Sequence, residues 1–233
     1  MPKPLRYIAL IPAAGVGTRL GQDVPKQYLR LGERTMLEHS IAAMLADARI
    51  DRVFVVIAPL DEHRQSHEAH DERVEFLAVG GASRAQSVLN GLIAIAARTS
   101  DDDRVLVHDA ARPCLGTIEL ARLIDEIGTD DRGGLLAMPL TDTLKRAEEG
   151  MVVETLRRDG LWCAQTPQMF RFASLRAALS AESLDNITDE ASAIERNGNF
   201  PRLVLGSATN IKVTSEQDLT LARAILAERD CSR

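Results

Sequence analysis

Short runs that are apolar at every position constrain the fold of this chain most. A strand with one face in water alternates apolar and polar residues, whereas a strand covered on both faces is apolar throughout. Helical patterns separate these runs, and this alternation is typical of an α/β fold with a doubly wound, mainly parallel sheet. The runs predicted to be strands are Tyr7–Ile11, Val53–Ala58, Val74–Val79, Val105–Asp109 and Gly134–Leu140.

Four helices are predicted from apolar stripes at helical spacing. Thr35 and Glu38 have the spacing of a capping box ahead of the first helix, and Ser83 stands at the N-cap position of the second. A third pattern starts from Thr117, and a fourth, with Ser215 in a near-capping box, closes the chain. These starts place a helix after most of the predicted strands, as a doubly wound sheet requires.

The segment Asp142–Phe170 interrupts this alternation. It has the pattern of two strands around a polar turn at Glu148–Gly150, followed by a third strand. Its cations are too closely spaced for a central strand, so we predict an antiparallel β-arm at about residues 140–165 that projects from the sheet. The chain has no linker-like, repeated or low-complexity segment, so residues 1–233 are predicted to form a single domain with this arm.

The composition narrows the possible partners. The chain has 233 residues and a formal net charge of −6, whereas proteins that bind nucleic acids or anionic membranes are usually basic. Aromatic residues make up only 3% of the chain, which disfavours a stacking platform for single-stranded nucleic acid. The three cysteines form no CxxC pair, and no apolar stretch has the length of a signal peptide or a membrane span. We therefore expect a cytoplasmic protein that binds neither nucleic acid nor a membrane.

A glycine-rich loop follows the first predicted strand, in the stretch PAAGVGTRLG from Pro12 to Gly21. It matches neither the P-loop, which ends in GK[ST], nor the GxGxxG dinucleotide motif. Its glycines still let backbone N–H groups approach an anion, and Arg19 and Lys26 add two cations nearby. The loop is therefore a candidate phosphate site, with a tight strand-to-helix turn as the alternative.

Two further polar stretches also follow predicted strands. VHDAARP contains Asp109, which can hold a divalent cation or a ribose hydroxyl, and Arg112, which can orient it. Ligands of open parallel sheets bind beyond the carboxyl ends of the strands, where this stretch lies. The alternative is a local ion pair that caps a turn. GGASRAQSV offers close backbone approach and the hydroxyl of Ser87, but it also fits an ordinary capped helix start.

A fourth stretch, ATNIKVT, places Lys212 inside a short apolar run. A lysine between isoleucine and valine is costly unless it meets an anion or lies on an open face. Other polar residues carry no functional prediction: His108 and Trp162 are interpreted as structural, and His63, His67 and His70 as one face of a solvated helix.

Eight motifs in order give the chain a specific resemblance. They are PAAGVGTRLG, PKQYL, GGASRAQSV, HDAARP, DTLKR, LWCAQTPQMF, TDEASAIE and NIKVT, and they extend nearly from end to end. With them the chain resembles the 2-C-methyl-D-erythritol 4-phosphate cytidylyltransferases of the non-mevalonate isoprenoid route. The sister enzymes that act on D-ribitol 5-phosphate share some of these motifs and are the nearest alternative.

The resemblance implies a Rossmann-like sheet of the nucleotide-diphospho-sugar transferase type. It also implies a reaction in which the phosphate of a polyol phosphate attacks the α-phosphate of CTP, with Mg²⁺ as cofactor. Arg19, Lys26 and Lys212 would be the catalytic cations around that phosphate. The implied nucleotide-binding residues are Pro12, Ala13, Ala14, Gly15, Gly17 and Thr18 for the triphosphate, and Gly80, Gly81 and Ser87 for the cytosine and ribose.

The resemblance also implies the polyol-phosphate side of the site. Thr143 and Arg158, on the arm, resemble residues that reach into the site of a partner subunit, which implies a homodimer. Thr209 and Ala82 stand where family members can carry acidic residues, so a second protein ligand of the metal is not identified. The implied substrate-binding residues are Asp109, Arg112, Thr143, Arg158 and Thr166, and Asp109 is also the candidate metal ligand.

Overall fold

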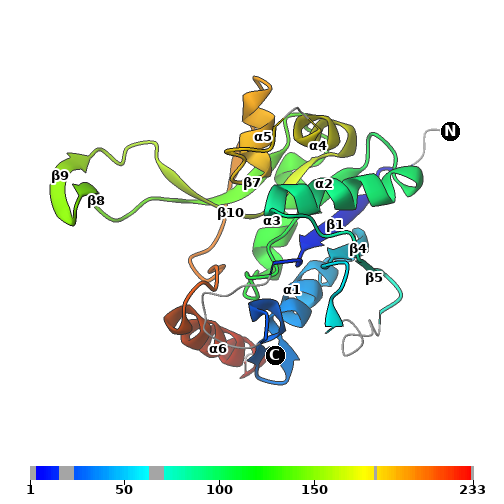
Figure 1. Cartoon of the computed structure of the whole chain (residues 1–233), viewed down its shortest axis with the longest axis horizontal. Helices are drawn as coiled ribbons and strands as arrows, with labels where there is room; N and C mark the ends of the chain where they lie inside the picture. The colour runs from blue at the N-terminus through cyan, green and yellow to red at the C-terminus, as the bar shows by residue number, and fades with distance from the viewer. Residues whose placement is uncertain (1–3, 16–23, 63–70, 181–182, 232–233) are drawn as a thin grey trace.

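The computed structural model describes residues 4–15, 24–62, 71–180 and 183–231. Its centre is a seven-stranded sheet with the strand order β11-β7-β10-β6-β1-β4-β5 (Figure 1). Neighbouring strands in this sheet are parallel except around β10, which is antiparallel to both β6 and β7. The mainly parallel, mixed sheet that the sequence predicts is therefore confirmed. Its strands are β1 (Tyr7–Pro12), β4 (Ile50–Val56), β5 (Val74–Leu77), β6 (Arg104–Val107), β7 (Gly134–Pro139), β10 (Trp162–Arg171) and β11 (Arg202–Leu205).

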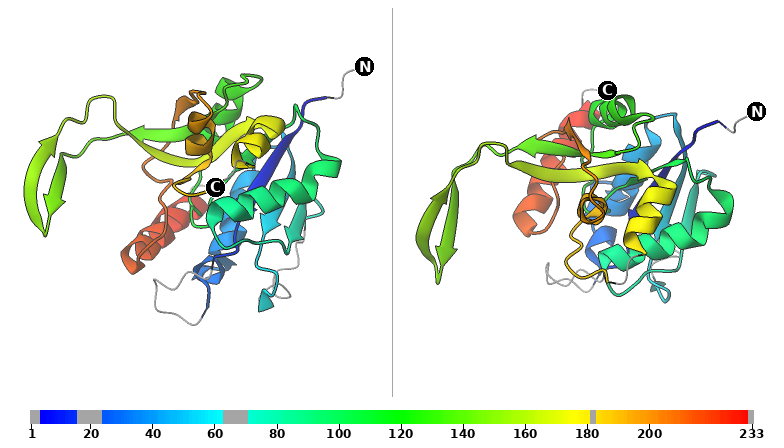
Figure 2. Two further views of the ribbon diagram at one scale, coloured as in Figure 1. Left: turned by 45° about the horizontal axis from the view of Figure 1, so that its top comes forward. Right: turned by 90° about the horizontal axis from the view of Figure 1, so that it is seen from above.

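Helices pack on both faces of the sheet (Figure 2). Helix α2 (Arg84–Ile95) covers one face with α4 (Phe172–Leu179) and α5 (Glu190–Arg196) beside it, and α1 (Met36–Leu45) and α3 (Thr117–Ile127) cover the other. This arrangement explains why the strands are apolar throughout, as β1 illustrates. Its side chains alternate between a hydrophobic core on the α2 face and a second core on the α1 and α3 face.

Smaller elements complete the described chain. The short 3₁₀ helix η2 (Lys26–Tyr28) and the two-residue strands β2 (Arg30–Leu31) and β3 (Arg34–Thr35) lie before α1, and the 3₁₀ helix η4 (Ala96–Arg98) continues α2. Helix α6 (Glu216–Cys231) packs near β2 and shares a third apolar cluster with the segment after β6. In the ranges that the structure describes, no helix is both long and apolar enough to cross a bilayer.

The predicted helix starts at Thr35, Ser83 and Thr117 are confirmed, the first two by side-chain caps. The hydroxyl of Thr35 accepts from the N–H of Glu38 at 3.2 Å, and the Glu38 carboxylate accepts from the N–H of Thr35 at 2.5 Å. The hydroxyl of Ser83 accepts from the N–H of Gln86 at 3.1 Å, and α3 begins at Thr117. Side-chain caps therefore set where α1 and α2 begin, whereas the N-cap of α3 is Gly116, which has no capping side chain.

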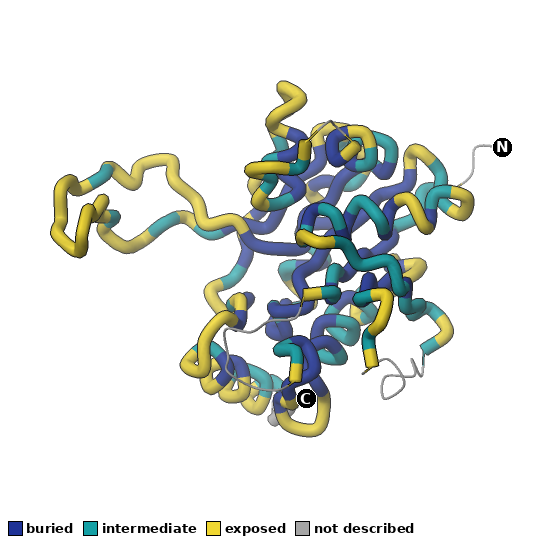
Figure 3. Tube along the Cα trace, in the orientation of Figure 1, coloured by how far each residue is buried: buried dark blue, intermediate teal, exposed yellow. Residues whose placement is uncertain are grey.

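The β-arm is a separate two-stranded sheet that extends away from the body of the molecule (Figures 1 and 3). Its strands, β8 (Leu144–Glu148) and β9 (Met151–Leu156), pair antiparallel around the predicted polar turn. Glu149 and Gly150 occupy this turn with φ angles of 48° and 80°. Both strands are mostly exposed, so the charged residues that excluded a central strand belong to a hairpin in water.

The third strand of the predicted arm does not belong to the arm, so this part of the prediction was wrong. Strand β10 enters the main sheet between β6 and β7, and only the segment before it projects. The reason is an abrupt change in burial and charge along the segment. The first part is exposed and charged, whereas residues 165–170 are buried, and pairing with the central strand β6 begins at Gln168. Helices α4 and α5 and strand β11 were not predicted.

Candidate active site

The four predicted polar stretches meet, in their described parts, at the edge of the sheet where the parallel strands end, here called the carboxyl edge. The loop after β1 and the loop after β5 are in direct contact. A Cβ atom on Gly80 would overlap the side chain of Ala14 and come within 2.8 Å of the carbonyl oxygen of Ile57. Only glycine fits at position 80, because the neighbouring backbone cannot move aside without disturbing β4.

The buried side chain of Gln27 holds the loop after β1 in place. The amide nitrogen of Gln27, on η2, donates to the carbonyl oxygens of Ala13 at 2.8 Å and of Gly15 at 3.0 Å. The N–H of Ala13 donates to the carbonyl oxygen of Val56 at 2.7 Å. The described part of the predicted phosphate loop, Pro12–Gly15, is therefore fixed to β4 and η2. Gly17, Thr18 and Arg19 lie outside the described residues.

The loop before α2 uses the Ser87 hydroxyl internally. Ser87 donates to the carbonyl oxygen of Ser83 at 2.9 Å and accepts from the N–H of Gly81 at 3.0 Å. A hydroxyl has one proton, so Ser87 keeps only an acceptor for any ligand. Within the chain Ser87 therefore shapes the Gly80–Gly81 turn. Contact of Gly80, Gly81 and Ser87 with the nucleotide stays a prediction.

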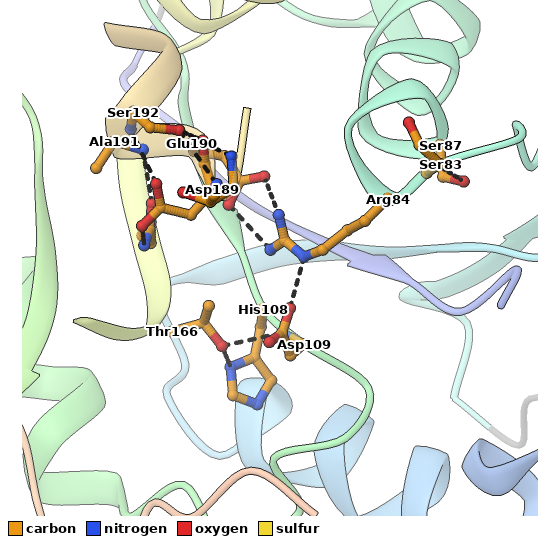
Figure 4. A network of polar contacts seen from close by, with 12 residues as sticks. Ser83, Arg84, Ser87, His108, Asp109, Thr166, Asp189, Glu190, Ala191 and Ser192 are labelled. Carbon is orange, nitrogen blue, oxygen red and sulfur yellow. Dashed lines mark hydrogen bonds and ion pairs between the residues drawn. The ribbon is translucent and has the colours of Figure 1, made fainter. Parts of the chain in front are cut away.

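A buried carboxylate, Asp109, is the centre of the site. Its Oδ1 accepts from Nε of Arg84 at 2.8 Å (Figure 4). Its Oδ2 accepts from Nζ of Lys212 at 2.8 Å. Nε of Arg112 lies 3.9 Å from Oδ2. These four side chains, called the Asp109 cluster below, come from the start of α2, the loop after β6 and the loop before α6.

Charge decides the ionisation of Asp109. Burial alone would raise the pKa of its carboxyl group, but the positive charges of Arg84 and Lys212 outweigh burial and hold this pKa well below its usual range. Burial would likewise lower the pKa of Arg84, yet the charges of Glu190 and Asp109 raise it. Asp109 is therefore a fixed negative charge that Lys212 and Arg84 neutralise in the absence of ligand.

Thr166 and His108 fix the backbone on which Asp109 stands. The Thr166 hydroxyl accepts from the N–H of Asp109 at 3.0 Å and lies 3.0 Å from Nδ1 of His108. Nε2 of His108 lies 3.1 Å from the carbonyl oxygen of Arg112. Because a carbonyl only accepts, Nε2 carries the proton of the neutral ring and Nδ1 accepts from Thr166. His108 has the structural role that the sequence predicts, and Thr166 acts beside it.

The loop that carries Lys212 is tied to the loop after β6. Arg112 donates to the carbonyl oxygen of Asn210 at 2.6 Å, and the N–H of Val213 donates to the carbonyl oxygen of Ala111 at 2.8 Å. Nζ of Lys26 donates to the carbonyl oxygen of Val213 at 3.3 Å. The predicted cations Lys26, Lys212 and Arg112 therefore lie in one neighbourhood, although 187 residues separate Lys26 from Val213 in the sequence.

The two arm residues do not join this cluster within one chain. Thr143 and Arg158 are exposed, and Arg158 bonds to the carbonyl oxygen of Thr141 on the arm itself. The hairpin follows the carboxyl end of β7, and it extends away from the body of the molecule in both views of Figure 2. Trp162, interpreted as arm or core packing, is 40% exposed where β10 begins. His63, His67 and His70 lie outside the described residues.

Sequence reasoning missed three residues of the site. Arg84 and Glu190 form a charged pair next to Asp109, and Gln27 supports the β1 loop. Each belongs to one of the eight motifs. They were missed because polar residues at such positions, on a helix or in a turn, usually face water. The available signal was the capping spacing of Asp189 and Ser192, which marks the start of a helix at Glu190.

Backbone loops, cations and a buried carboxylate at the carboxyl edge of a doubly wound sheet form the site of a nucleotide-handling α/β enzyme. Residues 7–228 match the family model described as 2-C-methyl-D-erythritol 4-phosphate cytidylyltransferase. The chain belongs to this family, as its motifs predicted.

Individual relatives agree with the family match. A protein of the same description from Laribacter hongkongensis is 53% identical over 95% of this chain and 96% of its own length. A crystal structure described as 4-diphosphocytidyl-2C-methyl-D-erythritol synthase has a TM-score of 0.87 and 41% identity, covering 96% of this chain and 99% of that one. The Francisella tularensis 2-C-methyl-D-erythritol 4-phosphate cytidylyltransferase has a TM-score of 0.81 and 34% identity, covering 94% and 99%.

The buried ring of His108 makes acid stability a test of the site geometry. Burial lowers the pKa of His108 to about 4 from 6.5, with Asp109 and Arg112 as the charged neighbours. The unfolded chain therefore binds a proton that the folded chain excludes between these values, so stability falls as the pH falls through this window. Through this one group the free energy of unfolding should decrease by about 2 kcal/mol between pH 6.5 and pH 4.5.

The measurement is denaturant unfolding across this pH range for the wild type and for His108→Asn, which keeps an acceptor for Thr166. The variant should be less stable at neutral pH but should have a shallower slope below about pH 6.5. An unchanged slope in the variant would contradict the assignment of a buried neutral ring.

Proposed function

We propose that this chain transfers the cytidylyl group of CTP to 2-C-methyl-D-erythritol 4-phosphate and releases pyrophosphate. The observation that carries this function is the Asp109 cluster, in which Lys212 and Arg84 balance a buried carboxylate beside the Pro12–Gly15 loop. Family membership over residues 7–228 supports the identity of the two substrates. Location in the cytoplasm stays a prediction.

In this reaction a phosphate oxygen of the polyol phosphate attacks the α-phosphorus of CTP. A new phosphorus–oxygen bond forms there, and the bond to the bridging oxygen of the β-phosphate breaks with its electron pair on pyrophosphate. No bond to the protein is made, so catalysis depends on alignment of the two phosphates and on stabilisation of the charge that develops around the phosphorus.

The described cations are suited to this task. We assign Lys212 and Lys26, with Arg19 by resemblance, to the oxygens of the α-phosphate. The Lys212 side chain is 44% exposed, so it can leave Asp109 and meet a phosphate without rearrangement of the core. Pro12–Gly15 and, by resemblance, Gly17 and Thr18 would hold the triphosphate, and Gly80, Gly81 and Ser87 the nucleoside. Arg112 and Thr166 would face the polyol phosphate.

Mg²⁺ is proposed as the cofactor, and the donor set fits an ion that arrives with the nucleotide. Within the described ranges, no group of three or more His, Cys, Asp and Glu side chains could cage a metal. Magnesium usually binds through one or two carboxylates together with substrate phosphates and water. Asp109 would supply that carboxylate, and the ion would neutralise charge on the phosphates.

A homodimer through the β-arm is the second part of the proposal. Three consecutive apolar residues on β9 are largely in water: Met151 is 71% exposed, Val152 62% and Val153 50%. Exposed apolar side chains on a projecting hairpin are suited to contact with a partner chain. A partner chain would cover them, and Thr143 and Arg158 of one arm would then complete the site of the other subunit.

Turnover with defined substrates tests the reaction directly. Pyrophosphate release from CTP should be rapid with 2-C-methyl-D-erythritol 4-phosphate and slow with D-ribitol 5-phosphate, because the family match favours the first substrate. The two polyol phosphates are assayed side by side at equal concentrations with Mg²⁺. Preference for ribitol phosphate would overturn the substrate assignment, and no turnover with either would overturn the enzyme assignment.

Removal of Lys212 tests the charge mechanism. Lys212→Ala should lower kcat by about 100- to 1,000-fold, the cost of one preorganised donor at a developing charge, while CTP still binds. Steady-state pyrophosphate release and calorimetric CTP binding measure the two effects. Arg132→Ala is the control, because it removes an exposed cation that pairs with Asp130 before β7, at the opposite edge of the sheet. Equal loss in both variants would contradict a local role of Lys212.

Mixed dimers test whether the arm acts across subunits. Arg158→Ala should weaken use of the polyol phosphate more than binding of CTP. A dimer of one Arg158→Ala chain and one Lys212→Ala chain should recover turnover, because one of its sites then combines an intact Lys212 with an intact partner arm. Two differently tagged chains are co-expressed, and the mixed dimer is purified and assayed. If the mixed dimer is no more active than the parental variants, the arm does not act in trans.

A further inference from the structure

Arg84 contacts two buried carboxylates at once. Its Nε donates to Oδ1 of Asp109 at 2.8 Å, and its Nη1 and Nη2 donate to the two oxygens of Glu190 at 2.7 Å and 3.0 Å (Figure 4). The paired bonds to Glu190 fix the plane of the guanidinium group. With that plane fixed, Nε has one direction in which to donate, and this direction leads to Asp109.

Glu190 is too deeply buried to contact a substrate. Its side chain is 1% exposed, and its carboxylate pairs with Arg84. The residues on either side of it are held by one residue of β10: Gln168 donates to the Asp189 carboxylate at 2.8 Å and accepts from the N–H of Ala191 at 2.8 Å. Glu190 is therefore a rigid anchor, and anything it contributes to the site must pass through Arg84.

A buried ion pair of this kind usually adds little net stability to a fold. Two charges removed from water lose hydration that their attraction barely repays, so apolar residues of similar size often stabilise a protein as well or better. The Arg84–Glu190 pair contacts Asp109, the one buried carboxylate of the Asp109 cluster. This location indicates that the pair matters more for the geometry of the site than for the stability of the fold. Arg84 is also the first residue of α2, directly after the Gly80–Ser83 loop.

We propose that Arg84 and Glu190 are positioning residues: Glu190 orients Arg84, and Arg84 holds the Asp109 carboxylate at a fixed distance from the start of α2. Arg84 keeps Oδ1 in place when the exposed Lys212 moves from Oδ2 to a phosphate. This inference rests on the proposed function, which assigns Gly80 and Gly81 to the nucleoside and Asp109 to the metal ion at the phosphates.

The decisive variant is the double replacement Arg84→Met/Glu190→Leu, compared with each single replacement. Each single variant should unfold at a lower temperature than the wild type, because it leaves a charge without its partner. The double variant should regain most of the lost thermal stability, yet kcat should remain about 10- to 100-fold below the wild type, the effect of a small misplacement at a reacting centre. A crystal structure of the double variant should show the Asp109 side chain displaced.

A matched control is available on the surface. Arg98 and Glu75 form a pair with the same two-bond geometry, at 2.7 Å and 3.0 Å, outside the Asp109 cluster. Arg98→Met/Glu75→Leu should leave kcat unchanged. Recovery of both stability and kcat in the Arg84→Met/Glu190→Leu variant would overturn the positioning role and leave a structural one.

Two further comparisons keep the test decisive. If the double variant does not fold, Glu190→Gln keeps the shape of the side chain and removes its charge. Its kcat should fall while the KM for CTP stays near the wild-type value, and an unchanged kcat would overturn the inference. Wild-type turnover with 2-C-methyl-D-erythritol 4-phosphate tests the proposed function separately, since the positioning role is judged from ratios of variant to wild type and from the Asp109 side-chain position.

Discussion

The buried negative charge of Asp109 is the constraint around which the site is built. An isolated carboxylate at this depth would become protonated, because desolvation favours its neutral form. Arg84 and Lys212 at 2.8 Å prevent this, and they come from parts of the chain far apart in sequence. The α2 start, the loop after β6 and the loop before α6 must therefore meet at one point for the carboxylate to be tolerated. The same meeting creates a cation-rich edge in a chain whose net charge is −6.

Strand β10 makes this meeting possible. It runs against the parallel strands, so it begins at the carboxyl edge and delivers Thr166 to the backbone of Asp109. Two residues further on, Gln168 pairs with β6 and holds the start of α5. Strand β10 thereby supports Asp109 in two ways. Thr166 holds its backbone directly, and Gln168 holds the start of α5, whose Glu190 orients Arg84 against the Asp109 carboxylate. The irregular register between Ala164 and Gln168 frees these side chains from the regular alternation of a strand.

The sequence predicted the parts of the fold that depend on local chemistry. Capping residues such as Thr35 and Ser83 act on the adjacent backbone, and apolar runs report burial on both faces, so these predictions were confirmed. The insertion of β10 into the sheet depends on its pairing with β6, some 60 residues earlier. The residues of the β10 segment alone do not indicate this long-range pairing. Arg84 and Glu190 were missed for the same reason. A charged residue on a helix usually faces water, and only a partner 106 positions away makes these two an internal pair.

The two cations on Asp109 differ in a way that suits a reaction with charged substrates. Arg84 is fixed by a bidentate bond to a buried carboxylate, whereas Lys212 has an exposed side chain and, among the described residues, pairs with Asp109 through a single bond. Phosphate arriving at this edge competes for the lysine and not for the arginine, because Lys212 gives up a single contact and Arg84 would give up three. Lys212 can therefore bind a substrate phosphate while Arg84 keeps Asp109 ionised. An arrangement with two equally mobile cations would lose the position of the carboxylate at the moment when the phosphates enter.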